Sequence, residues 1–236
     1  ATGDYNNDKL SDIAVSGYVW KDGKAGSGFV DVFLGTGRGI GAAQRIRSVV
    51  WTNGAVANPT SVSATAIVTT NYRLRTTPDL IVAIDDHAQG RGGFIVLAND
   101  GTGKFAPTSS YSLDAAYPAP STILHVDVNP LIDPLNHPDV VLLSNAADGS
   151  ALLNVFLSDS AGNIGTTLYW AIGIGHKVSG LTAIDLNEDG AADFAYIGSR
   201  EDNAIQPQVR VAMNYRDGKT WKSFSDSLPV LNFDSF

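Results

Sequence analysis

The sequence predicts an all-β protein built as a β-propeller of four-stranded blades, which either closes alone or is part of a larger ring. Two observations carry this prediction. Short apolar runs rich in Val, Ile, Leu and Phe recur in pairs, and a turn containing Gly or Asp follows each pair. The pattern occurs four times, with an Asp at the start of each pair and roughly 60 residues from one pair to the next. Four-stranded units repeated at this period describe propeller blades or a related array.

The second strand of each repeat is expected directly after an acidic loop. These strands begin at Asp12, Asp79, Asp139 and Asp193 and read "DIAV", "DLIVAI", "DVVLL" and "DFAYI". Because these runs are nearly continuous in apolar residues, we expect them to be buried on both faces, between two neighbouring blades. The third strands read "FVDVFL", "GFIVLA", "LLNVFL" and "VRVAM", and each ends at a polar turn typical of hairpin connections.

The remaining strands complete each unit. "TILHV" and "LTAI" are expected as first strands, and "QRIRSVVW" and "TTLYWAI" as fourth strands. We therefore expect one domain whose repeats span approximately residues 1–55, 56–118, 119–175 and 176–236. The first strand of repeat one is almost absent, because the acidic loop begins at residue 4.

The tail "SLPVLNFDSF" is apolar enough to form a further strand, with Val230, Leu231 and Phe233 available. It can pair with repeat one, or continue the outer strand of repeat four. Residue spacing favours the second alternative, which leaves an unpaired sheet edge that another chain or flanking blades must cover. Because the chain starts at Ala1, we interpret it as a processed or excised segment.

The composition excludes several classes of protein. The formal net charge of −8 and the pI of about 4.8 argue against a nucleic-acid partner, because phosphate binding requires clustered Lys and Arg. The chain has no cysteine, so disulfides and thiolate metal sites are excluded. No apolar run is long enough for a membrane helix, so we expect no membrane insertion.

Two acidic loops carry the most specific signal. "DYNNDKLSD" and "DLNEDGAAD" set oxygen-bearing side chains at relative positions one, three, five and nine, and each leads into an apolar strand. Calcium prefers six to eight hard oxygen ligands, which such a loop supplies together with a backbone carbonyl at position seven. The predicted ligands are Asp4, Asn6, Asp8, the carbonyl of Leu10 and Asp12 in the first loop, and Asp185, Asn187, Asp189, the carbonyl of Ala191 and Asp193 in the second. The alternative interpretation is a solvated, Asx-rich turn.

The middle repeats depart from this pattern. Repeat three keeps Asp127 and Asn129, but its loop is longer and contains prolines; Asp133 is the candidate for the missing ligand. Repeat two has Arg73 and Arg75 where an acidic residue would be needed, so an arginine is expected to pair with Asp79 instead.

The sequences "GDYNNDKLSDIAV" and "DLNEDGAADFAYIG", followed by "VFLGTGRG" and "NDGTGKF", resemble FG-GAP repeats, also described as VCBS repeats. The resemblance covers nearly the whole chain and is specific in repeats one and four. It implies an integrin-type β-propeller whose blades bind calcium, in a secreted or cell-surface protein that mediates adhesion or ligand binding.

The sequence favours no enzyme class. It has no G-x-S-x-G elbow, no H-E-x-x-H and no Cys nucleophile, and His87, His125, His137 and His176 fall in different repeats. The loop "DDHAQGRGG" is expected to be an exposed connection. Four tryptophans, Trp20, Trp51, Trp170 and Trp221, are candidates for stacking on sugar rings or for packing between blades.

We therefore expect a non-enzymatic, extracellular calcium-binding module that recognises a glycan or a protein, in the manner of a lectin or adhesin. The alternative is a structural propeller domain or subunit that mediates assembly of a larger secreted enzyme, toxin or surface complex.

Overall fold

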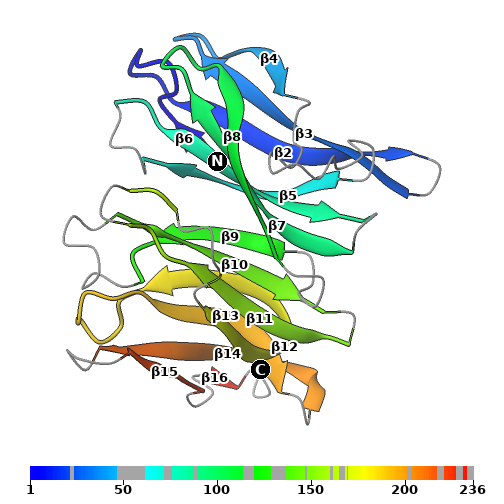
Figure 1. Cartoon of the computed structure of the whole chain (residues 1–236), viewed down its shortest axis with the longest axis vertical. Coiled ribbons are helices and arrows are strands. Elements are labelled where there is room, and N and C mark those ends of the chain that lie inside the picture. The colour runs from blue at the N-terminus through cyan, green and yellow to red at the C-terminus, as the bar shows by residue number, and fades with distance from the viewer. Residues whose placement is uncertain are drawn as a thin grey trace. The chain divides into compact units, whose positions relative to one another are not determined.

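The structure, a computed structural model, is all-β in its described residues, as predicted (Figure 1). It describes residues 1–21, 24–46, 62–71, 76–87, 90–113, 120–128, 137–146, 148–159, 162–164, 168, 170–200, 203–216, 221–226 and 231–232. No helix in these residues is long and apolar enough to cross a membrane. The chain divides into two compact units, Ala1–Ile123 and Leu124–Phe236.

The first unit contains two antiparallel four-stranded sheets, one for each of the first two predicted repeats. The sheet of repeat one has the order β1-β2-β3-β4, formed by β1 (Thr2–Gly3), β2 (Asp12–Lys21), β3 (Lys24–Gly35) and β4 (Ile40–Ile46). The sheet of repeat two has the order β5-β6-β7-β8, formed by β5 (Val62–Thr70), β6 (Asp79–Asp86), β7 (Arg91–Asn99) and β8 (Phe105–Ser112). The two-residue β1 agrees with the nearly absent first strand expected for repeat one.

These two sheets pack face to face through one apolar cluster. It joins Ala14, Val30 and Val32 of repeat one to apolar side chains of repeat two that include Leu80 and Ile95. Glycine is required where β3 approaches the backbone of β5: a Cβ at Gly28 would lie 2.9 Å from both the Ala64 nitrogen and the Val62 oxygen.

The second unit forms one continuous sheet with the order β15-β14-β13-β12-β11-β10-β9, and β16 pairs with β14. The strands are β9 (Pro120–Val126), β10 (Asp139–Asn145), β11 (Ser150–Phe156), β12 (Trp170–Ile184), β13 (Asp193–Arg200), β14 (Asn203–Arg216), β15 (Trp221–Asp226) and β16 (Leu231–Asn232).

Strand β12 belongs to both predicted repeats of this unit. Its first part pairs with β11 as the fourth strand of repeat three, and its second part pairs with β13 as the first strand of repeat four. The register shifts between His176 and Gly180, and Lys177 adopts φ 48° there. A backbone in this left-handed region interrupts the extended chain, so the expected boundary at residue 176 coincides with the change of partner.

The two halves of this sheet pack against each other. One cluster contains Val141 and Leu143 of repeat three together with Phe194, Tyr196 and Ala212 of repeat four. Each unit therefore encloses an apolar interior between two layers, which are separate four-stranded sheets in the first unit and the two halves of one continuous sheet in the second.

Burial of the second strands differs from the prediction for the outer repeats. Leu80 through Ile84 in β6 and Val140 through Leu143 in β10 have no exposed surface, as expected for strands buried on both faces. In repeats one and four, however, Val15 is 45% exposed and Ile197 is 42% exposed. An apolar run therefore did not by itself ensure burial of both faces.

The described part of the tail lies against repeat four, the alternative that residue spacing favoured. Leu231 pairs with Val209, and Asn232 pairs with Gln208, while β15 pairs with the later residues of β14. Strands β15 and β16 thus share the outer edge of this sheet. Val230 and Phe233 lie outside the described residues.

Candidate metal centre

The first acidic loop is folded by hydrogen bonds from its own backbone to its acidic and amide side chains. Asp4 accepts the Asp8 N–H at 3.0 Å and the Lys9 N–H at 2.9 Å, through different carboxylate oxygens. The Asn6 amide oxygen accepts the Asp8 N–H at 3.2 Å, and Asp8 accepts the Leu10 N–H at 2.8 Å. These local bonds curl the chain so that the side chains at alternate positions come to the same side of the loop.

The second acidic loop repeats this arrangement bond for bond. Asp185 accepts the Asp189 N–H at 3.1 Å and the Gly190 N–H at 2.9 Å. The Asn187 amide oxygen accepts the Asp189 N–H at 3.1 Å, and Asp189 accepts the Ala191 N–H at 2.9 Å. The two loops are far apart in sequence and differ at their intervening positions, so the shared fold follows from the spacing of their Asp and Asn residues.

The backbone conformations match as well. Asn7 and Glu188, at the fourth position, have φ angles of 60° and 59°. Lys9 and Gly190, at the sixth position, have φ angles of 69° and 86°. The sixth position therefore needs a left-handed backbone in both loops, which glycine adopts more readily than lysine.

A buried aspartate closes the loop of repeat one. The two carboxylate oxygens of Asp12 accept the Tyr5 N–H at 2.6 Å and the Gly35 N–H at 2.7 Å. Asp12 has no exposed surface. It therefore fastens the start of the acidic loop and the end of the third strand to the start of the second strand. Its further role as a cation ligand stays a prediction.

The same fastening occurs in the other repeats. Asp79, Asp139 and Asp193 are also buried. Asp79 accepts the Asn99 N–H at 2.7 Å; Asp139 accepts those of Val128 and Ser158 at 2.9 and 2.7 Å; Asp193 accepts those of Leu186 and Asn214 at 2.9 and 2.6 Å. The Asp that begins each second strand thus has a structural role that sequence spacing detected as a repeat but did not explain.

The donor set of the two loops consists of oxygen atoms alone, which suits a hard cation such as calcium. In each loop the set comprises two carboxylates and one Asn side chain. The closing Asp and the backbone carbonyl at position seven are further predicted ligands, and their roles stay predictions. Among the described residues, no group of three His, Cys, Asp or Glu side chains is arranged to hold a metal ion. Beside the carboxylates, the amide oxygens of Asn6 and Asn187 accept the N–H groups of Asp8 and Asp189.

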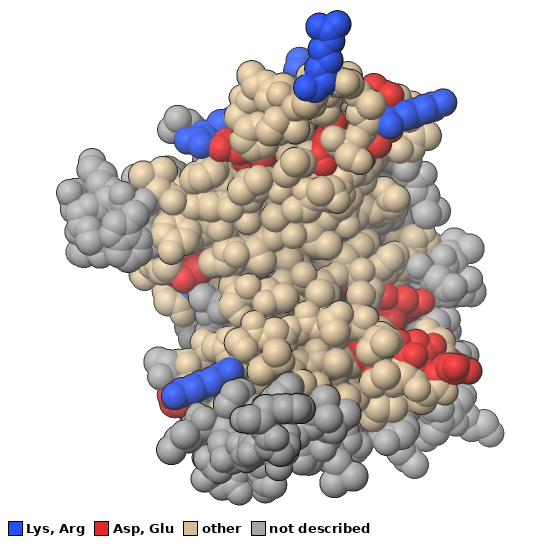
Figure 2. All heavy atoms as spheres, turned by 180° about the vertical axis from the view of Figure 1, so that it is seen from behind, with Lys and Arg blue, Asp and Glu red and all other residues tan. Residues whose placement is uncertain are grey.

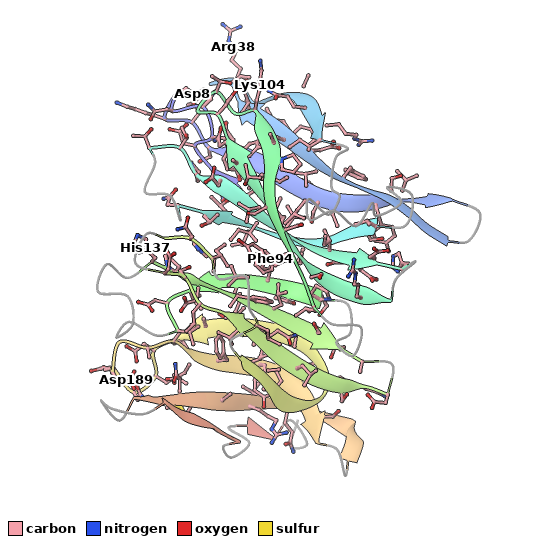
Figure 3. The ribbon with its side chains drawn as sticks, viewed as in Figure 1. Asp8, Arg38, Phe94, Lys104, His137 and Asp189 are labelled. Atoms are coloured by element: carbon pink, nitrogen blue, oxygen red, sulfur yellow. The ribbon has the colours of Figure 1, made fainter. Side chains whose placement is uncertain are left out.

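Figure 3 shows Asp8 and Asp189 on the loops that precede β2 and β13 in their respective units. On the face drawn in Figure 2, acidic side chains gather in patches instead of spreading evenly.

The predicted residues of repeats two and three are only partly described. Arg73, Arg75, Asn129 and Asp133 lie outside the described residues. Asp127, at the start of the third loop, accepts the Ala192 N–H through its backbone carbonyl at 3.1 Å. The third loop is therefore hydrogen-bonded to repeat four.

Two asparagines join neighbouring repeats, and the sequence reading missed both. The Asn99 side chain donates to the Tyr5 carbonyl of repeat one at 2.8 Å and to the Pro78 carbonyl of its own repeat at 2.9 Å. Asn214 likewise donates to the Val128 carbonyl of repeat three at 2.9 Å, and to the Ala192 carbonyl of its own repeat at 3.3 Å.

Both asparagines directly follow a third strand's apolar run. The corresponding residues of repeats one and three are Gly35 and Ser158; the Ser158 hydroxyl donates to the Pro138 carbonyl of its own repeat at 2.7 Å. Comparison of the residues at this position in the four repeats is the sequence signal that could have identified the two asparagines.

A second polar cluster lies where β5 begins and β6 ends. The Ser63 hydroxyl is 2.8 Å from Nε2 of His87, and Nδ1 of His87 is 2.9 Å from a carboxylate oxygen of Asp85. Burial raises the pKa of Asp85, against the opposing effect of His87. The order Ser–His–Asp is that of hydrolase triads, but Ser63 is only 1% exposed, so its hydroxyl is not presented to a substrate.

The structure does not test the prediction for the four tryptophans. The side chains of Trp20, Trp170 and Trp221, and all of Trp51, lie outside what the structure describes.

No protein-family model matches the chain, and no curated protein sequence matches it.

Proposed function

We propose that this chain is a non-enzymatic, calcium-binding β-propeller module of the FG-GAP type. It binds calcium in the loops of repeats one and four, and it recognises a glycan or protein ligand in the extracellular space or at a cell surface. The observation that supports this proposal best is the bond-for-bond agreement between residues 4–12 and residues 185–193.

This agreement favours a cation site over a polar turn that arose by chance. Both loops use the same Asp and Asn positions, share the left-handed conformation at the fourth and sixth positions, and enter the second strand at a buried Asp. Glycine at the sixth position and oxygen ligands at alternate positions are features of calcium-binding loops. Calcium would supply the positive charge that draws these oxygens together.

Face-to-face packing of successive four-stranded sheets supports the propeller part of the proposal. Propeller blades are four-stranded antiparallel sheets that each pack against their neighbours. The two apolar clusters join repeat one to repeat two and repeat three to repeat four in this way.

Assembly is the second candidate function. The exposed apolar side chains of repeats one and four favour a surface that contacts another protein. In this case the module would hold together a larger secreted enzyme, toxin or surface complex instead of retaining a free sugar.

Calcium titration of the metal-stripped chain by isothermal calorimetry tests the cation sites. We expect two sites in the wild type, and one site in each of Asp8→Ala and Asp189→Ala. Asp148→Ala is a matched control, because Asp148 is an exposed turn aspartate outside both loops. No heat of binding with the wild type, or equal binding by all variants, would contradict the proposal.

A glycan array probed with the calcium-loaded chain separates the two candidate functions. A recognition module retains particular sugars and releases them when its ligand surface is blocked by free glycan. An assembly module retains none of the isolated sugars, and would instead capture its protein partner.

A further inference from the structure

The two sheets in each unit meet through fixed faces that can be identified along the second strand. In repeats two and four, the first and third residues after the Asp that begins the second strand point to the preceding repeat, as Leu80 and Phe194 show. In repeats one and three, the second residue points to the following repeat, as Ala14 and Val141 show. Because side chains alternate along a strand, each sheet has one face toward the other sheet of its unit and one face turned away from it.

The second residue of the acidic loop belongs to the face toward the following repeat. Tyr5 in repeat one and Val128 in repeat three have no exposed surface and lie in the two apolar clusters. Tyr5 also packs edge-on against Phe105 of repeat two, with ring centroids 5.3 Å apart. The equivalent residue of repeat four is Leu186, which is 46% exposed.

Leu186 belongs to an exposed apolar face of repeat four. Ile184 is 47% exposed and Ile197 is 42% exposed. Ile197 is the fourth residue after Asp193, so its side chain lies on the face of the sheet opposite to Phe194. Its cross-strand partner is Gly180, where even an added Cβ would lie 3.9 Å from the Ile197 side chain. We call Ile184, Leu186 and Ile197 the trailing face.

Repeat one exposes the complementary face. Val15, the third residue after Asp12, is 45% exposed on the side opposite Ala14, where repeat two has the buried Val82. Its cross-strand neighbour Asp31 is paired with Arg45, which also lies 4.2 Å from the centroid of the Phe29 ring. We call Val15, Phe29, Asp31 and Arg45 the leading face. Its charges already pair with each other, so a partner could cover them without leaving an unpaired ion.

We infer that the trailing face of one chain docks on the leading face of a second copy, head to tail. The residues of the trailing face occupy the positions that, in repeats one and three, contact the following repeat. The surface that fits the trailing face is therefore the face by which a repeat contacts the repeat before it. The leading face of this same chain is such a surface, and its Val15 and Arg45 are exposed. A head-to-tail contact uses two different surfaces of each copy, so each copy can bind two others. The inference deepens the proposed assembly role, and its test substitutes no residue of the two acidic loops.

Sedimentation velocity over a wide range of protein concentration tests the inference, using the wild type, Val15→Lys and Ile197→Lys. Both side chains are exposed, so a lysine there changes the fold little, whereas a buried lysine at the interface is costly. Ala106→Lys is a matched control, since Ala106 is exposed on the outer strand of repeat two. Circular dichroism verifies that all variants are folded.

We expect the wild type and Ala106→Lys to associate as concentration rises, and each of the other variants to lose association. An equimolar mixture of Val15→Lys and Ile197→Lys should regain it, because each variant retains the face that the other has lost. This rescue is specific to head-to-tail contact. A monomeric wild type, or association that persists in either variant, would overturn the inference and leave the calcium titration unaffected.

Discussion

At the scale of single residues, the sixth position of the two acidic loops offers a matched pair. Lys9 and Gly190 have the same left-handed conformation, but only glycine adopts it without steric cost. Lys9→Gly should raise the free energy of unfolding, because it removes backbone strain, and Gly190→Lys should lower it, because it adds strain. Each change should be about 1 kcal/mol or less, since glycine also makes the unfolded chain more flexible and this effect partly offsets the difference in strain. Urea denaturation of both variants measures these changes. Effects of the same sign in the two variants would contradict the equivalence of the loops.

His125 gives a pH dependence. Burial lowers the pKa of its imidazole to about 4, although a hydrogen bond to the Pro138 backbone opposes this shift. Above pH 6.5 the ring is neutral in both the folded and the unfolded chain. Between pH 6.5 and 4 only the unfolded chain takes up the proton, so folding stability falls by up to about 3 kcal/mol as the pH decreases.

Urea denaturation of the wild type and of His125→Gln at several pH values measures this effect. The variant should lose less stability than the wild type across the window, because its side chain does not titrate. Parallel profiles for the two proteins would contradict the assignment.

The sequence was informative for residues whose partners are local. The spacing of Asp4, Asn6 and Asp8 predicted an acidic loop, and the structure shows that this spacing also sets the turn's hydrogen bonds. It was uninformative for Asn99, because the partner of this residue is the carbonyl of Tyr5, which is remote in sequence. It also gave no reason to place Ser63 beside His87, a contact that depends on the pairing of β5 with β6.

At the scale of elements, the bonds of Asn99 and Asn214 make pairs of repeats the structural unit. Asn99→Ser should imitate Ser158, keeping a hydroxyl for the Pro78 carbonyl but losing the reach to Tyr5. An unpaired buried polar group costs about 1–3 kcal/mol, so the free energy of unfolding should fall by an amount in this range. Asn163→Ser is the control, because Asn163 is exposed in a turn. Equal stability of Asn99→Ser and the wild type would show that this bond between repeats contributes nothing.

The strands themselves were predictable because turns and apolar runs are local. Each of the four second strands begins at its predicted Asp, as β6 does at Asp79. The continuity of β12 was not predictable, since two short apolar segments separated by a polar stretch read as separate strands. Burial was also misjudged for Val15 and Ile197, because an apolar strand is buried on both faces only where a neighbouring sheet covers each face.

At the scale of the whole molecule, the account combines four similar repeats with an excess of acidic residues. The chain has 24 Asp and Glu residues against 16 Lys and Arg residues. Several of these acidic residues lie in two short loops, residues 4–12 and 185–193, where like charges close together in sequence repel one another and a bound cation would offset the repulsion. If the folded chain alone binds calcium, as we propose, the ion stabilises it by mass action, by about 2.7 kcal/mol for each site at a calcium concentration of a hundred times the dissociation constant.

Thermal unfolding of the metal-stripped chain, followed by circular dichroism with and without added calcium, tests the central claim most directly. The account predicts a Tm that rises with calcium concentration, rises much less with magnesium, and returns to its starting value when a chelator is added. In the double variant Asp8→Ala, Asp189→Ala the Tm should no longer respond to calcium. Superimposable unfolding curves of the wild type with and without calcium would contradict the claim that these loops bind calcium.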